Sequence, residues 1–214
     1  FIFEQWGESN MNTINKTLDH WLSNLAEFSY TDYEKLPDID LYMDQVVTYL
    51  EKQLSIFQTS SLDKQITSSM INNYVKGEVV RAPIAKKYNR QHLALIEEVC
   101  TLKQVLSIAE VKQIIDERYR KTDADYSVVF NQFKNSMTEK NLEAVDKTKQ
   151  ALENIQEDDL RSLTDLAVDL ALTANAYISI SKRILFLNKL LDEQNNEKNE
   201  KKKKEEEKKE GKPA

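Results

Sequence analysis

The fold is decided by the stretch from Ile66 to Gly77, which reads ITSSMINNYVKG. Apolar side chains at positions 70, 71 and 74 have the spacing of one helical face, and Thr67 or Ser68 can cap the first turn. Gly77 stands where a helix commonly ends on a left-handed residue. We therefore predict a short helix with a polar outer face made of Ser69, Asn72, Asn73 and Lys76.

This polar face suits the major groove of DNA. Asparagine amides offer a donor and an acceptor to base edges, and a lysine reaches phosphates or guanine edges. The alternative is an ordinary polar helix on the protein surface.

A basic segment follows the short helix. Val79–Arg81 and Ala85–Tyr88 are short enough to be the two strands of a hairpin, and Pro83 confines the connection to a turn or a sheet edge. A basic hairpin after a polar helix has the shape of a wing that lies beside the DNA backbone. A basic, solvated loop is the alternative.

The charge of the chain is distributed unevenly. The formal net charge is −6, but six basic residues and one acidic residue between Lys64 and Arg90 give that window +5, which leaves −11 for the rest. Local charge decides whether a polyanion can dock, so the acidic total does not exclude nucleic acid.

Helical patterns extend in both directions from this segment. Residues 12–30 carry an amphipathic stripe, and Asp38 or Asp40 is predicted to cap a second helix. Asn89 or Tyr88 precedes a long helix that opens at Arg90, and Ser107 with Glu110 forms a capping box for a short helix whose buried side includes Ile108.

The stretch from Ile66 to Ile115 resembles the MerR-type winged helix-turn-helix. The matching pieces are Met70–Lys76, Lys86–Leu93 and Leu106–Val111. The wider run from Leu36 is similar to an uncharacterised bacterial family of MerR-like proteins. The resemblance implies a mainly α fold with a small β wing and a bacterial DNA-binding regulator.

The sequence departs from the MerR pattern in two ways. Asn72 stands where the recognition helix often has an arginine, so its phosphate contact must come from Lys76 or Arg81. The C-terminal half lacks the cysteines of the metal-sensing members, which disfavours metal sensing. The resemblance places effector sensing or dimerisation in Thr122–Asp192.

The C-terminal part carries a heptad-like stripe of apolar or small residues from Leu160 to Leu191, with a second apolar side. A helix that is apolar on two sides must be covered on two sides. We expect a homodimer, with coverage by the chain's own domain as the alternative. The Lys- and Glu-rich end has no apolar face, which predicts a disordered tail or a frayed helix.

These patterns divide the chain into four parts. An N-terminal helix occupies 1–35, of which 1–10 has the character of an extension, and the winged helix-turn-helix occupies 36–120. A helical dimerisation or effector region covers 121–193, and the disordered tail covers 194–214.

Composition excludes several classes of protein. The 214 residues include 3 Gly, 3 Pro, 1 Cys and 2 His, which disfavours glycine-rich phosphate loops and excludes Cys-rich or three-His metal sites within one chain. We expect no cofactor, no metal and no enzymatic activity, because the acidic pairs Asp158–Asp159 and Asp165–Asp169 have no partner base or nucleophile nearby. The single cysteine and the charges within Leu166–Leu187 predict a cytoplasmic protein without a membrane span.

The sequence therefore predicts a sequence-specific, DNA-binding transcriptional regulator. Its partners would be double-stranded DNA, a second copy of the chain and a small-molecule effector. The alternative is a helical ligand-sensing or protein-interaction module that keeps the winged helix without binding DNA. The residues expected at the DNA are Ser68, Ser69, Asn72, Asn73, Tyr74, Lys76, Arg81, Lys86, Lys87, Tyr88 and Arg90.

Overall fold

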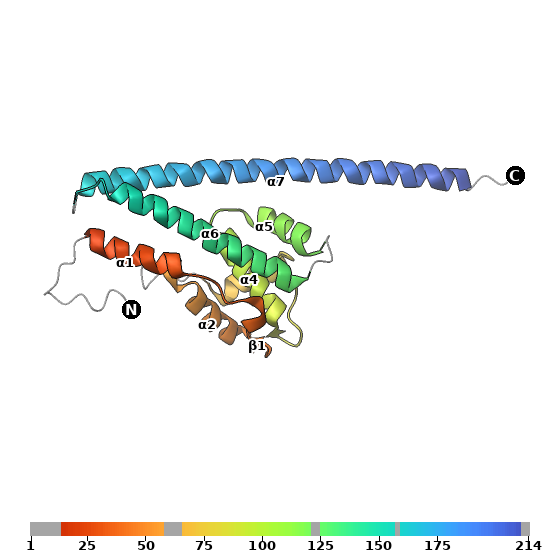
Figure 1. Cartoon of the computed structure of the whole chain (residues 1–214). Coiled ribbons are helices and arrows are strands. Elements are labelled where there is room, and N and C mark those ends of the chain that lie inside the picture. The colour runs from red at the N-terminus through yellow and green to blue at the C-terminus, as the bar shows by residue number, and fades with distance from the viewer. Residues whose placement is uncertain (1–13, 58–65, 121–124, 157–158, 211–214) are drawn as a thin grey trace. The chain divides into compact units, whose positions relative to one another are not determined.

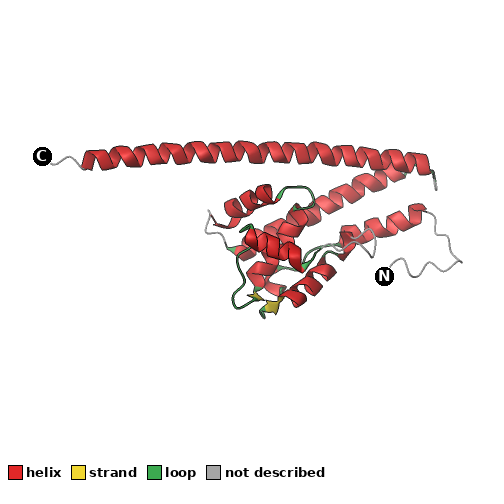
Figure 2. Ribbon diagram, turned by 180° about the vertical axis from the view of Figure 1, so that it is seen from behind, coloured by secondary structure: helices red, strands yellow, loops and turns green. Residues whose placement is uncertain are grey.

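The computed structural model is mainly helical and describes residues 14–57, 66–120, 125–156 and 159–210 (Figure 1). The helices are α1 Ile14–Glu27, α2 Met43–Gln53, α3 Ser68–Lys76, α4 Arg90–Leu102, α5 Ile108–Ile115, α6 Tyr126–Leu152 and α7 Leu160–Glu210. Two short antiparallel strands, β1 Leu41–Tyr42 and β2 Lys87–Tyr88, form a small sheet (Figure 2). The prediction of a mainly α protein with a small β element is confirmed.

Several predicted helix starts are confirmed by their caps. The Thr67 hydroxyl accepts from the Met70 N–H at 3.2 Å, and Asn89 Oδ1 accepts from the His92 N–H at 3.1 Å. Ser107 and Glu110 form the expected capping box. These side chains satisfy backbone donors that a helix leaves open at its first turn.

The predicted start of the second helix is wrong. Helix α2 begins at Met43, behind Tyr42, whose N–H donates to Gln45 Oε1 at 2.9 Å. Asp38 and Asp40 therefore lie outside the helix. The reason is tertiary: Leu41 and Tyr42 pair with β2, and a strand needs extended backbone that delays the helix.

Helix α4 is the centre of the core. Leu93, Ile96 and Val99 are completely buried, and Cys100 is buried as its apolar surroundings predict. Helix α4 contacts β2, α5 and α6, while α1 lies along α6 (Figure 1). Ile108, predicted to be buried, is instead 36% exposed at the first position of α5.

The chain divides into two units, 1–171 and 172–214, and helix α7 runs through both. Its backbone is helical to Glu210, so the disordered tail predicted for 194–214 is instead helical as far as residue 210, in agreement with the helical alternative. Lys and Glu are good helix formers, which explains the continuation. Residues 1–10, predicted to be an extension, lie outside the described residues.

Helix α7 exposes a large apolar surface. Leu170, Tyr177, Ile184 and Leu191 are between 42% and 65% exposed. Its section Leu160–Asn196 is long and apolar enough to cross a membrane, judged by length and composition alone, with a mean hydropathy of 1.2 in its most apolar window. Asp165, Asp169, Lys182 and Arg183 interrupt that section.

Candidate nucleic-acid interface

Helix α3 has one buried face and one exposed face. Ile71 and Tyr74 are buried in the core, at 0% and 5% exposure. The opposite side is exposed to solvent and carries Ser68, Ser69, Asn72, Asn73 and Lys76. Each residue of a helix is turned by about 100° from the last, so Ser69, Asn72, Asn73 and Lys76 share one face. The asparagines therefore point outward, as the sequence predicts.

Helix α3 ends differently from the prediction. Gly77 has a φ of −78°, and the left-handed residue is Glu78, with a φ of 57°. Asn73 O lies 3.2 Å from the place where a Cβ of Gly77 would stand. A Cβ at this position would force the last helical turn to shift by a few tenths of an ångström, and the reversal occurs one residue later.

Two cations from the region of α5 hold this reversal. Lys112 Nζ pairs with the Glu78 carboxylate at 2.7 Å, and the Arg120 guanidinium donates to the Glu78 carbonyl at 2.7 Å. Arg120 also pairs with Asp116 within the π-helical turn Asp116–Arg120. The sequence analysis missed both residues, because their partners lie 34 and 42 positions away and no local pattern links them.

The wing is smaller than predicted. Val79 and Val80 are buried and form no strand, while Ile84 and Lys87 exchange both backbone hydrogen bonds of a tight hairpin, at 3.2 and 2.9 Å. Ala85 and Lys86 form its two-residue loop, and both are left-handed, with φ of 50° and 63°. This is the pattern of a type I′ turn, which normally selects Asn and Gly. It puts the exposed Lys86 at the tip.

The β pairing joins the wing to the start of α2. Leu41 pairs with Tyr88 and Tyr42 with Lys87, and the Lys87 ammonium lies 5.3 Å from the centre of the Tyr42 ring. Tyr88 is buried and packs edge-on against His92 at 5.6 Å. Tyr74 and Tyr88 thus anchor helix and wing from within and present no surface to a ligand.

The basic residues predicted to contact phosphates differ in their exposure and in whether they already form an ion pair within the protein. Lys76, Arg81 and Lys86 are exposed and form no ion pair with a described residue. The Arg81 guanidinium lies 5.9 Å from the centre of the Tyr126 ring. Arg90 is instead only partly exposed and pairs with Asp38 at 3.0 Å, so it is already engaged within the protein. Lys64 lies outside the described residues.

His92 packs against the hairpin, through the Tyr88 ring and the Ala82 carbonyl. Its Nδ1 lies 3.1 Å from the Asn89 backbone nitrogen and 2.6 Å from Asn89 Oδ1, and its Nε2 lies 3.4 Å from the Ala82 carbonyl. Burial lowers the pKa of His92 below its usual value. Both ring nitrogens therefore contact groups of the protein itself, and the ring contributes to the cap of α4.

Two buried glutamates of α4 lie beneath the surface. Glu98 accepts from the Tyr119 hydroxyl at 2.6 Å and pairs with Arg118. Neither oxygen of Glu97 meets hydrogen-bond geometry with a described residue, although the phenol of Tyr49 is close enough to lower its pKa. Burial outweighs this and raises the pKa of Glu97 to about 8, so the carboxyl is protonated at neutral pH.

The remaining chemistry of the described residues is limited. No group of three or more His, Cys, Asp or Glu side chains among them is arranged to hold a metal. Asp159 accepts from the Ser162 hydroxyl at 2.8 Å and from backbone N–H groups at the start of α7, so it stabilises a helix terminus. Asp158 lies outside the described residues.

Comparison with known proteins adds one finding. No curated protein and no solved structure matches the chain. The model of one protein family, described as a domain of unknown function (DUF1836), matches residues 31–137. The match contains α2, α3, the hairpin, α4 and α5 and extends into α6. Because this match covers half of the 214 residues, the chain belongs to the DUF1836 family.

Proposed function

We propose that this protein is a sequence-specific, DNA-binding transcriptional regulator of the winged helix-turn-helix type. Helix α3 would enter the major groove with Asn72 and Asn73 at base edges, and the hairpin tip at Lys86 would lie on the phosphate backbone. One observation carries the proposal: the amide face of α3 is exposed and is followed within one hairpin by the exposed cations Arg81 and Lys86.

Charge distribution supports this assignment. The window from Lys64 to Arg90 holds +5 while the rest of the chain holds −11. A polyanion would be attracted to this segment and repelled elsewhere, which orients the protein on DNA. The MerR-like order of short helix, hairpin and capped helix agrees with such docking. Nothing in this argument requires a cofactor or an enzymatic step.

A dimer completes the proposal. Two copies joined through α7 would present two α3 helices to successive major grooves of a pseudo-palindromic site. We favour this use of the apolar surface of α7 over a membrane span. Lys182 and Arg183 adjoin within the span, and each costs about 2.5–3.5 kcal/mol at the centre of a membrane helix. A DNA-binding regulator would act where DNA is accessible, so the proposal includes a cytoplasmic location.

The runner-up is a protein-interaction module that has kept the fold without binding DNA. The exposed apolar residues of α7 favour it, because a helix with such a face must meet a partner. A purified protein that stays monomeric and ignores DNA would support this second function.

Salt dependence tests DNA binding directly. The full-length protein is titrated onto a fluorescein-labelled pool of random duplexes, and anisotropy is followed at several salt concentrations. Four phosphate contacts per subunit, from Lys76, Arg81, Lys86 and Lys87, predict a slope of log K against log salt of about −3 to −4 per subunit. A flat dependence, or no binding at low salt, contradicts the proposal.

Charge reversal identifies the surface. Lys86→Glu is expected to weaken binding to all sequences alike, because it replaces an attraction to phosphate by a repulsion. Lys147→Glu is the matched control: Lys147 is an exposed lysine of α6, far along the chain from α3. If both variants lose the same affinity, only the net charge matters and the hairpin is not the contact surface.

A further inference from the structure

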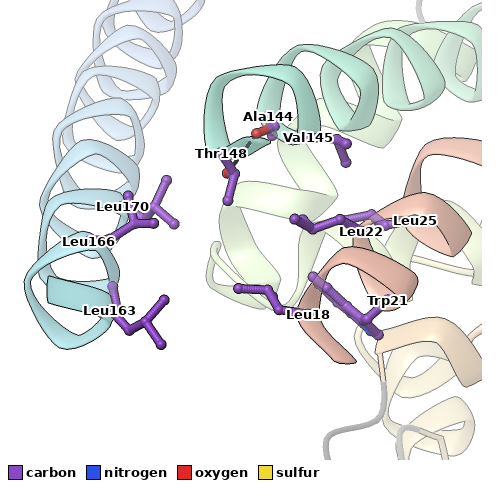
Figure 3. Close-up of a pocket in the computed structure, with 11 residues that line it drawn as sticks. Leu18, Trp21, Leu22, Leu25, Ala144, Val145, Thr148, Leu163, Leu166 and Leu170 are labelled. Carbon is purple, nitrogen blue, oxygen red and sulfur yellow. Dashed lines mark hydrogen bonds between the residues drawn. The ribbon is translucent and has the colours of Figure 1, made fainter. Parts of the chain in front are cut away.

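A pocket of about 330 Å³ lies between α1, α6 and the first turns of α7 (Figure 3). All of its lining residues belong to the unit 1–171. Its walls include Leu18, Trp21 and Leu22 of α1, Val145 and Thr148 of α6, and Leu166 of α7. It is separate from the α3 surface, and its α7 residues Leu163 and Leu170 also belong to the heptad-like stripe of α7.

The pocket offers almost no polar group to a ligand. Thr148 is the only lining residue with a hydroxyl, and it donates its proton to the Ala144 carbonyl at 2.8 Å. The indole N–H of Trp21 donates to the carbonyl of Ile56 at 3.4 Å, and Ile56 does not line the pocket. No lining residue is charged. A bound molecule would therefore meet hydrocarbon, an indole ring and a single weak acceptor.

Water is a poor occupant of such a space. At about 30 Å³ each, roughly eleven waters would fill this volume with almost no hydrogen-bond partner on the wall. An enclosed apolar cavity of about 150 Å³ stays dry and takes up benzene, and this more open pocket is lined by the same kind of side chain. This pocket has about twice that volume and falls within the range of about 300–1,000 Å³ that is typical of small-molecule sites.

We propose that this pocket binds an uncharged, apolar small molecule about the size of two aromatic rings or a medium-length alkyl chain. Size and the absence of charge on the wall select this class. The inference does not depend on DNA binding, so either can fail without the other.

A fluorescent probe tests the site. N-phenyl-1-naphthylamine, an uncharged two-aromatic molecule, is titrated into the full-length protein carrying Trp6→Phe, which leaves Trp21 as the sole tryptophan. We expect saturable binding at one site per chain, with energy transfer from Trp21 to the probe. Non-saturable binding, or binding without energy transfer, overturns the proposal.

Variants that fill the pocket locate the site. Ala167 lines the pocket yet is exposed, so Ala167→Phe adds a ring there without disturbing the core. It should weaken probe binding about tenfold or more, because the ring occupies the ligand volume. Ala144→Phe fills the pocket from α6 and should act in the same way. Ala176→Phe, at an exposed alanine of α7 outside the lining, should leave affinity unchanged.

Two further outcomes would contradict the proposal. If Ala167→Phe abolishes dimer formation in light scattering but leaves probe binding intact, the pocket holds a second copy of the chain. Competition tests the ligand class: 1-decanol should displace the probe better than decanoate, because no cation lines the wall to receive a carboxylate. Equal displacement by decanoate rules out the uncharged class.

Discussion

Ala85 has a left-handed backbone in the two-residue loop of the hairpin. Its φ is 50°, where a Cβ costs roughly 1–2 kcal/mol. Ala85→Gly should raise the free energy of unfolding by about 0.5–1 kcal/mol, since the added freedom of the unfolded chain offsets part of the relief. Urea unfolding measures the change. Ala82→Gly, at an exposed alanine without a positive φ, should instead destabilise the protein, and the opposite order would contradict the turn assignment.

Glu97 makes stability depend on pH. Its pKa rises from an ordinary value near 4.5 to about 8 in the fold, so the folded chain holds a proton that the unfolded chain releases. This contribution is fully present below pH 4.5 and declines by about 1.4 kcal/mol per pH unit as the pH rises towards 8. Glu97→Gln removes the titration, so the variant should gain stability relative to wild type on going from pH 6 to pH 8.

The same comparison separates Glu97 from its neighbours. His92 acts with the opposite sign, because its lowered pKa makes stability fall as the pH drops below its usual value near 6.5. Glu98, with a raised pKa, has the sign of Glu97. Both groups titrate in wild type and variant, so the difference between the two urea-unfolding curves reports Glu97 alone. Equal pH dependence in the two proteins would mean that Glu97 is ionised in the fold.

At the residue scale, the sequence correctly predicted the roles of side chains whose hydrogen-bond partners lie nearby in the chain. Thr67, Asn89 and Ser107 cap their helices as expected, because capping depends on residues two or three positions away. The ion pair of Arg90 with Asp38 spans 52 positions and has no local signature. The sequence therefore could not indicate which of the predicted phosphate contacts is already engaged.

At the scale of elements, α7 has an exposed apolar surface that no other described helix covers. Leu163, Leu170, Tyr177, Ile184 and Leu191 recur every seven residues, which is the repeat of a coiled-coil seam. Leu163 and Leu170 line the pocket against α1 and α6, so we expect a second copy to cover the seam from Tyr177 onward. Ile184→Lys should convert a dimer into a monomer, because a lysine at the seam would be buried without a partner.

Light scattering after size-exclusion chromatography measures this change. Leu172→Lys provides the control, since Leu172 is 61% exposed and lies two residues from the seam position Leu170. It should leave the dimer intact. A wild-type protein that is monomeric at micromolar concentration would refute the dimer, and an Ile184→Lys dimer would place the interface elsewhere.

The wing shows why strands were harder to predict than helices. Val79 and Val80 have strand-forming side chains, but they are buried under the end of α3, where Tyr74 O accepts from both of their N–H groups. The strand that does form pairs Lys87–Tyr88 with Leu41–Tyr42, across 45 or more positions. Such a pairing depends on how the helices pack and is not encoded in either segment.

At the scale of the whole molecule, helix content and the separation of charge follow from the sequence. The scarcity of glycine and proline and the 3–4 periodicity predict the helices, and the basic window predicts the candidate surface. The pocket between α1, α6 and α7 could not be predicted, because each helix alone has an ordinary apolar face. Its volume arises only when three such faces meet.

Selection of bound DNA from a random duplex pool, followed by sequencing, tests the central claim most directly. The account predicts one enriched, pseudo-palindromic motif for the wild type, and relaxed preference at one or two positions per half-site for Asn72→Ala, because Asn72 would contact base edges. Two results would contradict the assignment of α3 as the element that reads DNA. One is recovery of unenriched sequences by the wild-type protein, and the other is selection of the unchanged wild-type motif by both Asn72→Ala and Asn73→Ala.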